Sequence, residues 1–372
     1  MTPYFICLIV TLICALASIF PIARRPAVVV VFIMLTGFAG LRSEIGWDYE
    51  AYQYLYDSFT THTMVEAFNA GQAVDVLGFE PGFSFLVWLI AEIGANYQLV
   101  LAIFTVGLGL FAAYRLSPLA LPVFLLAYLW YGYYHNFSIL RQGLASGIIL
   151  FAVTLFHDRK RLAVALYAVA STIHLSAVFL TPVLAACIRF STRKVVLVTL
   201  GLCWILSLSS IVSGGVLALL ELIGRDRWLA LLQFGELTNK VGVSLVLIEY
   251  TLLAALLWFI DDDTFAIRFA RGVLVYRLLT YGVLNDISIA WERSSAFADP
   301  MYALALAIIL TTIVARFSRT VQVFLLNITC VVVAISFYVG FKYERMLSSE
   351  SRMEGERSHF ERFIPYKSIF EE

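Results

Sequence analysis

The sequence predicts an all-α, polytopic integral membrane protein with about 11–12 transmembrane helices, together with short re-entrant or interfacial helices. Three observations support this fold class. Hydrophobic residues make up 61% of the 372 residues and charged residues only 14%, whereas a soluble domain carries roughly a quarter charged residues. The mean hydropathy is +0.87. Several apolar runs also approach or exceed the roughly 20 residues that a helix needs to cross a bilayer.

Apolar runs interrupted by polar residues define the candidate spans. Two of them precede the polar stretch that begins at Arg42, and the others follow residue 97. In chain order they are residues 4–22, 27–41, 98–114, 119–135, 140–156, 161–173, 175–188, 195–212, 241–260, 272–289, 299–315 and 321–341. We therefore expect one polytopic membrane domain over residues 1–341 and a charged C-terminal tail over residues 342–372.

The basic residues predict which side each connection faces, because Lys and Arg in short loops mark the cytoplasmic side. The segments between the basic clusters, 42–97, 136–140, 213–240 and 290–298, are then external. The clusters themselves are Arg24-Arg25, Arg115, "DRKR" (158–161), "RFSTRK" (189–194), Arg268 to Arg277 and "RFSR" (316–319).

Two apolar segments do not fit a simple span. Residues 82–95 are too few to cross comfortably, so a half-embedded or re-entrant helix is expected. Residues 161–188 form either two short helices around "TIHLS" (172–176) or one long tilted helix. The second alternative would invert the topology of everything downstream.

The overall charge and the cysteines exclude several classes of protein. The formal net charge is zero, so no global field favours nucleic acid or a polybasic membrane anchor. The five cysteines are scattered through apolar segments without metal-ligand spacing. Neither a disulfide framework nor a zinc site is expected. An A-x-A pattern lies at residues 15–17, but basic residues follow it and none precedes it. An uncleaved first helix is therefore expected.

Three arginines stand at outer helix ends, against the positive-inside bias. They are Arg42, Arg141 and Arg293, and each has an acid or an amide nearby in the sequence. An arginine at membrane depth costs about 2.5–3.5 kcal/mol on insertion scales, and such residues usually mark a site or a pair. The alternative is that these side chains snorkel to the outer headgroups.

The stretch "LRSEIGWDYEAYQYLYD" (41–57) places acids and tyrosines directly behind an apolar run. A helix would align Tyr49, Tyr52 and Tyr56 in one stripe, with Asp48 beside it as N-cap. Gly46 gives the backbone freedom at the bilayer exit. The alternative is an interfacial helix whose tyrosines form an aromatic belt. That alternative accounts for the tyrosines and leaves Asp48 unexplained.

Two more polar positions flank short apolar helices. Glu80 precedes Pro81, which suits the first position of a helix, and a carboxylate beside a helix N-terminus is favoured by the helix dipole. A plain capping role for Glu80 is the alternative. His174 stands alone between apolar runs, where a hydrogen-bonded core histidine is the alternative to a catalytic one.

The stretch "YHNFSILRQGLASGIILFA" (134–152) carries the remaining polar candidates. Asn136, Arg141 and Gln142 lead into an apolar helix. Gly143 and Gly147 form a G-x-x-x-G pattern, which is typical of close helix packing in membranes. The glycines are explained by helix packing alone, whereas Arg141 and Asn136 at the start of the helix are harder to explain by packing.

In this order, the motifs resemble those of the EpsG family of bacterial exopolysaccharide and O-antigen proteins, whose members look like Wzy-type polysaccharide polymerases. The motifs are an arginine, G-x-D-Y-x-x-Y, Glu before a short apolar helix, N-x-x-x-x-R-Q and H-L-S, over about residues 40–185. Trp47 stands where the family has a small polar residue, and Ser43-Glu44 is a further departure. These differences leave substrate preference open. A GT-C-like arrangement of the helices is a further expectation.

The resemblance implies a glycosyltransferase of the bacterial inner membrane whose active site faces the periplasm. It would join undecaprenyl-diphosphate-linked oligosaccharide repeats of an O-antigen, capsule or exopolysaccharide. The expected partners are this lipid-linked glycan, membrane lipids and a chain-length regulator protein, without nucleic acid; no cofactor and no metal are expected. The candidate catalytic residues are Asp48, Glu80 and His174, and the candidate substrate-binding residues are Arg42, Tyr49, Tyr52, Asn136, Arg141, Gln142 and Arg293.

Their chemistry suits the reaction that the resemblance implies. Arginine binds and neutralises a diphosphate leaving group. A carboxylate or imidazole accepts the proton of the attacking sugar hydroxyl, and aromatic faces hold sugar rings. Another lipid-linked glycan transferase, such as an O-antigen ligase, differs mainly in its acceptor and stays open. A transporter of the lipid-linked oligosaccharide also stays open, although such proteins usually show internal repeats and none is found here.

Overall fold

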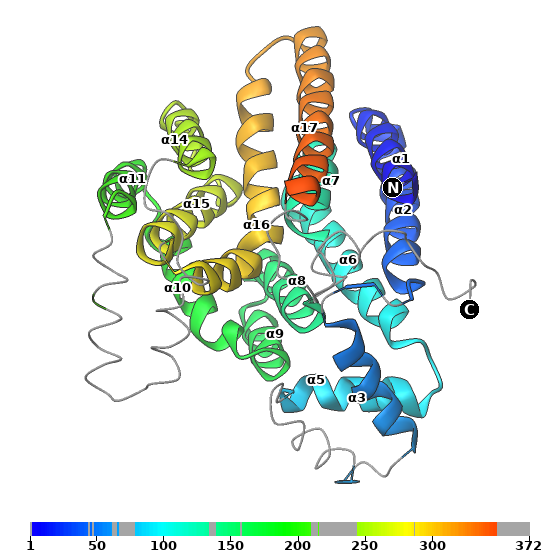
Figure 1. Ribbon diagram of the computed structural model, residues 1–372. Helices are drawn as coiled ribbons and strands as arrows, with labels where there is room; N and C mark the ends of the chain where they lie inside the picture. Colours follow the sequence, from blue (N-terminus) through cyan, green and yellow to red (C-terminus); the bar gives the residue numbers. More distant parts are fainter. Residues whose placement is uncertain are drawn as a thin grey trace.

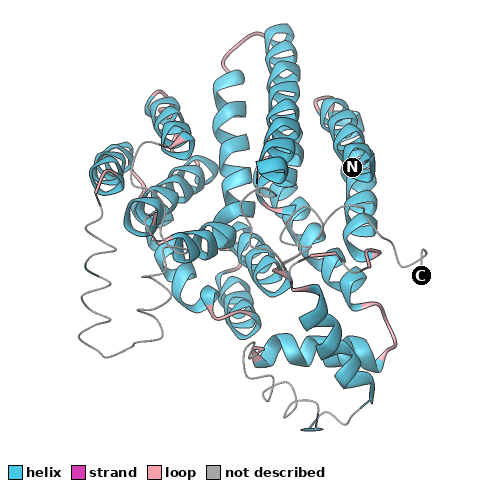
Figure 2. Ribbon diagram, viewed as in Figure 1, coloured by secondary structure: helices cyan, strands magenta, loops and turns pink. Residues whose placement is uncertain are grey.

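The computed structural model describes residues 2–43, 45–46, 48–61, 65–66, 79–133, 139–156, 158–209, 215, 244–285 and 287–347. Within these residues the secondary structure is helical and contains no β-strand (Figure 2). The prediction of an all-α fold is confirmed. The proposed polar tail lies outside the described residues after position 347, and the last helix continues up to that residue.

One helix lies over each candidate span, and two more lie in the polar stretch between the second and third spans (Figure 1). In the first half of the chain the helices are α1 (Thr2–Ser18), α2 (Pro21–Gly40), α3 (Tyr49–Thr61), α5 (Pro81–Glu92), α6 (Tyr97–Leu116), α7 (Leu121–Tyr131) and α8 (Leu140–Leu155). In the second half they are α9 (Lys160–Ile173), α10 (Ser176–Phe190), α11 (Arg193–Ser207), α14 (Leu245–Trp258), α15 (Phe265–Leu284), α16 (Ser288–Val314) and α17 (Arg319–Leu347).

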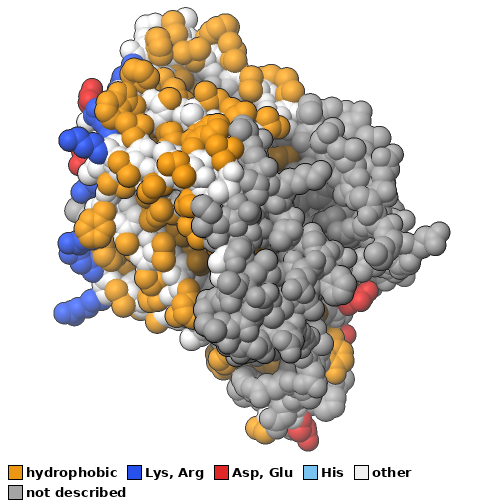
Figure 3. Space-filling model, turned by 60° about the vertical axis from the view of Figure 1, so that its left-hand side comes forward, with side chains coloured by type: hydrophobic (Ala, Val, Ile, Leu, Met, Phe, Trp, Pro, Cys, Tyr) orange, Lys and Arg blue, Asp and Glu red, His pale blue; other side chains and the backbone are white. Residues whose placement is uncertain are grey.

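Among the described residues, four helical segments have the length and composition to cross a membrane. They are α2, α6, and the segments Arg293–Val314 of α16 and Arg319–Ser336 of α17. Several further helices are apolar but shorter, such as α7 with 11 residues, which reaches only about 17 Å. Large apolar side chains cover much of the described surface in Figure 3. The chain is thus a polytopic membrane protein, and the number of complete spans stays a prediction.

Residues 161–188 form two helices, so the two-helix alternative is correct. The break lies at His174, whose backbone is extended (φ −151°, ψ 127°), between the end of α9 and the start of α10. The two-helix arrangement is the alternative that agrees with the positive-inside pattern of the basic connections.

The connections that carry the basic clusters lie together at one end of the bundle. Arg25 contacts the end of α6, and side chains from the other connections pair across them. The contacts are Arg25 Nε to Tyr114 Oη (3.4 Å), Arg115 to Asp158 (2.7 Å), Arg193 to Asp261 (2.5 Å) and Arg316 to the Phe259 carbonyl (2.7 Å). Lys and Arg also gather along one edge in Figure 3.

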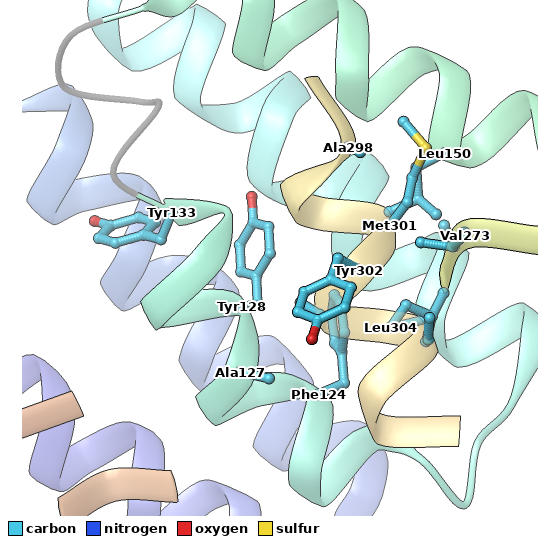
Figure 4. Packing of buried hydrophobic residues seen from close by; sticks show 14 of the residues in the cluster. Phe124, Ala127, Tyr128, Tyr133, Leu150, Val273, Ala298, Met301, Tyr302 and Leu304 are labelled. Carbon is cyan, nitrogen blue, oxygen red and sulfur yellow. The ribbon is translucent and has the colours of Figure 1, made fainter. Parts of the chain in front are cut away.

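The core lies where α16 packs against α7, α8 and α15. Phe124 and Tyr128 from α7 face Met301 and Tyr302 from α16 (Figure 4), and all four are at most 1% exposed. Away from this core, α3 packs on α5, and α5 contacts α9. In Figure 1 this α3–α5 pair lies at the lower end of the molecule, beyond the end of α2.

Candidate active site

Glu80 joins three separate parts of the chain at the α3–α5 end. Its Oε2 lies 2.6 Å from Nη1 of Arg141 at the start of α8. Its Oε1 lies 2.6 Å from Nδ1 of His174 and accepts a hydrogen bond from the Leu175 N–H at 3.0 Å. The three side chains are 16–18% exposed. The structure therefore brings together three candidates that are far apart in sequence.

The local backbone explains why Glu80 reaches across the bundle. Pro81 occupies the start of α5, and the Glu80 side chain makes no capping hydrogen bond to its own helix. The carboxylate instead binds the backbone N–H that precedes α10, which is an open donor because the chain breaks at His174. The plain capping role within α5 is therefore wrong, and Glu80 stabilises the N-terminus of another helix.

Gly82 lets α5 approach α9 closely enough for the Glu80–His174 contact. A Cβ atom at this position would lie 2.2 Å from Thr172 Oγ1 and 2.8 Å from the Thr172 carbonyl carbon. No side chain fits without a shift of the backbone. In contrast, a Cβ on Gly147 of the G-x-x-x-G pattern would meet the Thr105 carbonyl at an ordinary 3.5 Å, so the helices pack less tightly at Gly147 than at Gly82.

Gly82→Ala is therefore expected to lower the polymerising activity that the sequence resemblance implies about 10- to 100-fold while the protein still folds, because displacement of a site by about 1 Å has effects of this size. The measurement is polymerisation in vitro together with a thermal unfolding scan. Gly37→Ala is the matched control, since a Cβ there meets nothing within 4 Å. Full activity of Gly82→Ala would show that the close contact does not position the site.

Aromatic rings hold Arg141 in place. Its guanidinium carbon lies 4.8 Å from the centre of the Phe79 ring, a cation–π arrangement. The Tyr52 hydroxyl oxygen accepts a hydrogen bond from the Arg141 guanidinium. Tyr52 is only 2% exposed, and its ring lies against Phe79 and Phe83. Tyr52 thus supports Arg141 and presents no open face to a sugar ring.

The charges around Glu80 keep its carboxylate ionised. Burial alone would raise the pKa of this carboxyl. The hydrogen bond with His174, the charge of Arg141 and the N–H of Leu175 outweigh burial and lower the pKa from 4.5 to about 2. A carboxylate with such a low pKa is a weak proton acceptor. The contact of Glu80 Oε1 with His174 Nδ1 does, however, orient the His174 ring.

Arg42 contacts the backbone around the end of its own helix. It is 1% exposed at the end of α2, and its guanidinium donates to the carbonyls of Ala39 and Ile45. Gly46 follows with φ +110°, which confirms the predicted freedom of the backbone. Arg42 therefore braces the turn that leads into α3, and its role in binding a diphosphate stays a prediction.

Asp48 and Tyr49 lie at the start of α3. Tyr52, on the same helix, connects them to the junction formed by Glu80, Arg141 and His174. The Tyr52 N–H donates to the Asp48 carbonyl at 3.1 Å, and the charge of Asp48 acts on the Tyr52 hydroxyl. Both Asp48 and Tyr49 are half-buried. Their predicted roles, in proton transfer and in stacking on a sugar, stay predictions.

Gln142 and Arg293 connect two helices. The Gln142 side chain is 1% exposed and donates from Nε2 to the Arg293 carbonyl at 2.5 Å, which ties the start of α8 to α16. The Arg293 side chain itself is exposed. Asn136 lies outside the described residues. Gln142 thus acts first as a tie between helices, and the substrate-binding roles of all three stay predictions.

A second charged cluster, which sequence reasoning missed, lies within the helices. Arg277 in α15 is 4% exposed. Its Nη1 lies 2.7 Å from Asp299 in α16, its Nε donates to Tyr250, and it stacks on the Tyr302 ring at 4.6 Å. Glu249 in α14 accepts hydrogen bonds from Tyr131 at 2.6 Å and Tyr302 at 2.8 Å.

This cluster corrects the topology prediction. Arg277 does not belong to a cytoplasmic loop, and neither does Arg271, which is 3% exposed and pairs with Asp263. Arg277 pairs inside the bundle with Asp299, whereas Arg271 pairs with Asp263, an exposed residue of the connection before α15. Helix α15 begins at Phe265, seven residues before the predicted span, and therefore includes both arginines. The available signal was Glu249 within "VLIEYTLL", since an ionisable residue inside an apolar run usually has a buried partner.

These features define a polytopic, all-helical membrane protein with an acid–arginine–histidine junction at one end of its bundle. The model of the EpsG family matches residues 27–351, which is most of the chain, and the chain belongs to this family. The family points to a membrane role of the polysaccharide-polymerase kind. No curated protein matches the chain, and no solved structure does. The expected GT-C-like arrangement therefore stays a prediction.

Proposed function

We propose that this protein polymerises oligosaccharide repeats carried on undecaprenyl diphosphate, at the periplasmic face of the bacterial inner membrane. A hydroxyl of the acceptor repeat attacks the anomeric carbon of the donor sugar. The new glycosidic bond forms as the bond from that carbon to the diphosphate breaks, and the hydroxyl proton passes to the enzyme. The single observation that carries this proposal is the Glu80 carboxylate, which holds Arg141 and His174 together.

His174 is the proposed proton acceptor. With Nδ1 directed at Glu80, the neutral ring carries its proton on Nδ1 and its lone pair on Nε2. Nε2 then takes the proton of the sugar hydroxyl, and the carboxylate stabilises the imidazolium that forms. The same division of roles, a base oriented by a carboxylate, operates in hydrolytic triads. Glu80 is thus a positioning residue, with a pKa of about 2 that suits it for this role.

Arg141 is the proposed ligand of the diphosphate. A diphosphate carries more negative charge than one carboxylate, so it competes with Glu80 for the guanidinium. Arginine is suited to this because its planar fork binds phosphate oxygens in pairs. The Phe79 ring below it and the Tyr52 hydroxyl beside it fix the plane of the fork. Neutralising the leaving diphosphate lowers the barrier to breaking its bond to the sugar.

The helix directions support the proposed periplasmic face. Helices α8 and α9 run between the basic end of the bundle and the junction: Leu155 and Lys160 lie near the Arg115–Asp158 pair, whereas Arg141 and His174 lie at the opposite ends. Since basic connections face the cytoplasm in most membrane proteins, the junction faces the other side. The lipid-linked repeats are polymerised there in the proposed reaction.

Replacing Arg141 by Lys is expected to keep the protein folded yet remove most of its activity, because lysine retains the charge and loses the planar fork. The measurement is polymerisation of a purified lipid-linked repeat by both proteins in nanodiscs. Arg159→Lys, in an exposed position at the basic end, is the matched control. Turnover of Arg141→Lys close to wild type would assign Arg141 a structural role only.

The product of the same assay separates the alternatives. A polymerase forms a ladder of lipid-linked chains from one purified repeat. An O-antigen ligase forms no ladder until a different acceptor is added, and a transporter forms no new glycosidic bond at all. In cells, deletion of the gene is expected to leave single-repeat product in place of long chains. Unaltered long chains would contradict the proposed function.

A further inference from the structure

A cavity of about 300 Å³ lies at the basic end of the bundle, away from the candidate active site. It opens to the surface and is lined by the α1–α2 turn, the start of α7, the end of α16 and the start of α17. Arg24 and Arg319 line it from opposite elements, and apolar side chains such as Ile19, Val323 and Leu326 form much of the remaining wall. The cavity is therefore amphipathic, with two cations above an apolar floor.

The backbone adds positive potential to the two arginines. Three helices begin at this cavity: α2 at Pro21, α7 at Leu121 and α17 at Arg319. The N-terminus of a helix carries a partial positive charge and favours anions. Among the lining residues, all of which the structure describes, there is no acid.

The negative ends of the neighbouring helices are already satisfied. At the end of α1, the Ser18 carbonyl accepts a hydrogen bond from Arg24 Nε at 3.0 Å. At the end of α16, the carbonyls of Ala315 and Phe317 accept hydrogen bonds from Gln322 at 3.0 and 2.7 Å. These three carbonyls are therefore engaged, and the charged side chains that line the cavity are the cations Arg24 and Arg319.

The depth of the cavity indicates what kind of anion it receives. Two of the long apolar helices, Pro21–Gly40 and Arg319–Ser336, begin at its rim, which places the rim at headgroup level. Leu326 lies two turns further into α17, at acyl-chain depth. A soluble anion would use the rim and leave the apolar floor empty. An anionic amphiphile would fill both parts.

We propose that this cavity binds an acidic phospholipid from the leaflet at this end of the bundle. Arg24, Arg319 and the three helix N-termini hold its phosphate, and the apolar wall of α17 contacts the upper part of an acyl chain. The site is independent of the proposed polymerisation, because no residue of the Glu80 junction lines it. Its ligand class is defined by one phosphate, a net negative headgroup and an apolar tail.

The test is a lipid titration of the purified protein, followed by native mass spectrometry. The probes are phosphatidylglycerol, phosphatidylcholine and inorganic phosphate. Each arginine near a membrane surface strengthens binding of acidic lipid by a factor of about five, so Arg24→Gln/Arg319→Gln is expected to weaken phosphatidylglycerol binding about 25-fold. The matched control, Arg159→Gln/Arg161→Gln, removes two exposed charges outside the cavity at the same end and is expected to change binding less than about twofold.

A third variant keeps both charges and fills the space. Ala315 is exposed and lines the cavity, so Ala315→Trp is expected to displace phosphatidylglycerol without changing the charge. Equal binding of phosphatidylglycerol and phosphatidylcholine would overturn the proposal. So would a loss of phosphatidylglycerol binding in Arg159→Gln/Arg161→Gln as large as that in Arg24→Gln/Arg319→Gln. Displacement of the lipid by millimolar inorganic phosphate would show a site for free anion in its place. Unchanged lipid binding by Ala315→Trp would also overturn it.

Discussion

Substitution of Glu80 by glutamine is expected to lower polymerisation by about 10²–10⁴-fold, because His174, the proposed base, then loses the carboxylate that positions it, and a positioned acid–base group usually contributes a factor of this size. Glutamine keeps the shape of the side chain but removes its charge. The imidazolium of His174 then lacks its stabilising partner, and the Arg141 guanidinium loses the carboxylate that orients it. The measurement is the rate of chain extension in nanodiscs, with insertion and thermal stability measured on the same preparation.

Two further variants make this prediction specific. Glu80→Asp retains the charge, but the shorter side chain cannot reach Arg141 and His174 at once, so an intermediate loss is expected. Glu50→Gln removes an exposed acid from α3 at the same end of the bundle and is expected to change the rate little. If Glu80→Gln extends chains at the wild-type rate, the junction only holds helices together.

Replacement of Arg277 by methionine is expected to destabilise the protein by about 3–5 kcal/mol, because removal of one partner leaves the other charge buried and unpaired. That partner is Asp299, whose side chain is 14% exposed and lies 2.7 Å from the guanidinium. The Tyr250 hydroxyl also loses its donor. The measurement is the thermal unfolding temperature of the purified protein in detergent, together with its yield from membranes.

A second substitution shows whether the pair itself causes the loss. In Arg277→Met/Asp299→Leu both charges are absent, so most of the stability is expected to return. Arg268→Met is the control, since Arg268 is exposed on the same helix. If Arg277→Met melts at the wild-type temperature, the buried ion pair contributes nothing to stability. If the double variant is less stable than the single one, the unpaired charge is not the cause.

The sequence predicts that polar residues at the outer helix ends form one site, and the structure brings only some of them together. Glu80, Arg141 and His174 each stand beside an apolar run near a predicted outer end. They do meet, although Glu80 lies 61 residues from Arg141 and 94 from His174. Arg42 has the same kind of position in the sequence but lies buried at the end of α2, where it donates to nearby carbonyls. The local sequence pattern does not distinguish an arginine that joins the junction from one that braces a turn.

The amino-acid sequence by itself determined the fold class, the order of the helices and the family motifs. Those properties depend on composition and on the lengths of apolar runs, because a helix satisfies its backbone groups within its own segment and needs apolar side chains facing lipid. The turn at Gly46 is local in the same sense, whereas the sequence left two alternatives for residues 161–188 and the structure decided for the break at His174. Such features are therefore readable from a short window of residues.

Only the tertiary structure decided how the charges are paired. Whether Glu80 caps its own helix or binds His174, and whether Arg277 marks a loop or occupies the core, depends on which helices lie side by side. Tyr52 likewise has the spacing of an aromatic face but is covered by Phe79 and Phe83. In a membrane the cost of an unpaired charge forces each buried ion to find a partner. The identity of that partner is set by packing between distant segments, which no local pattern records.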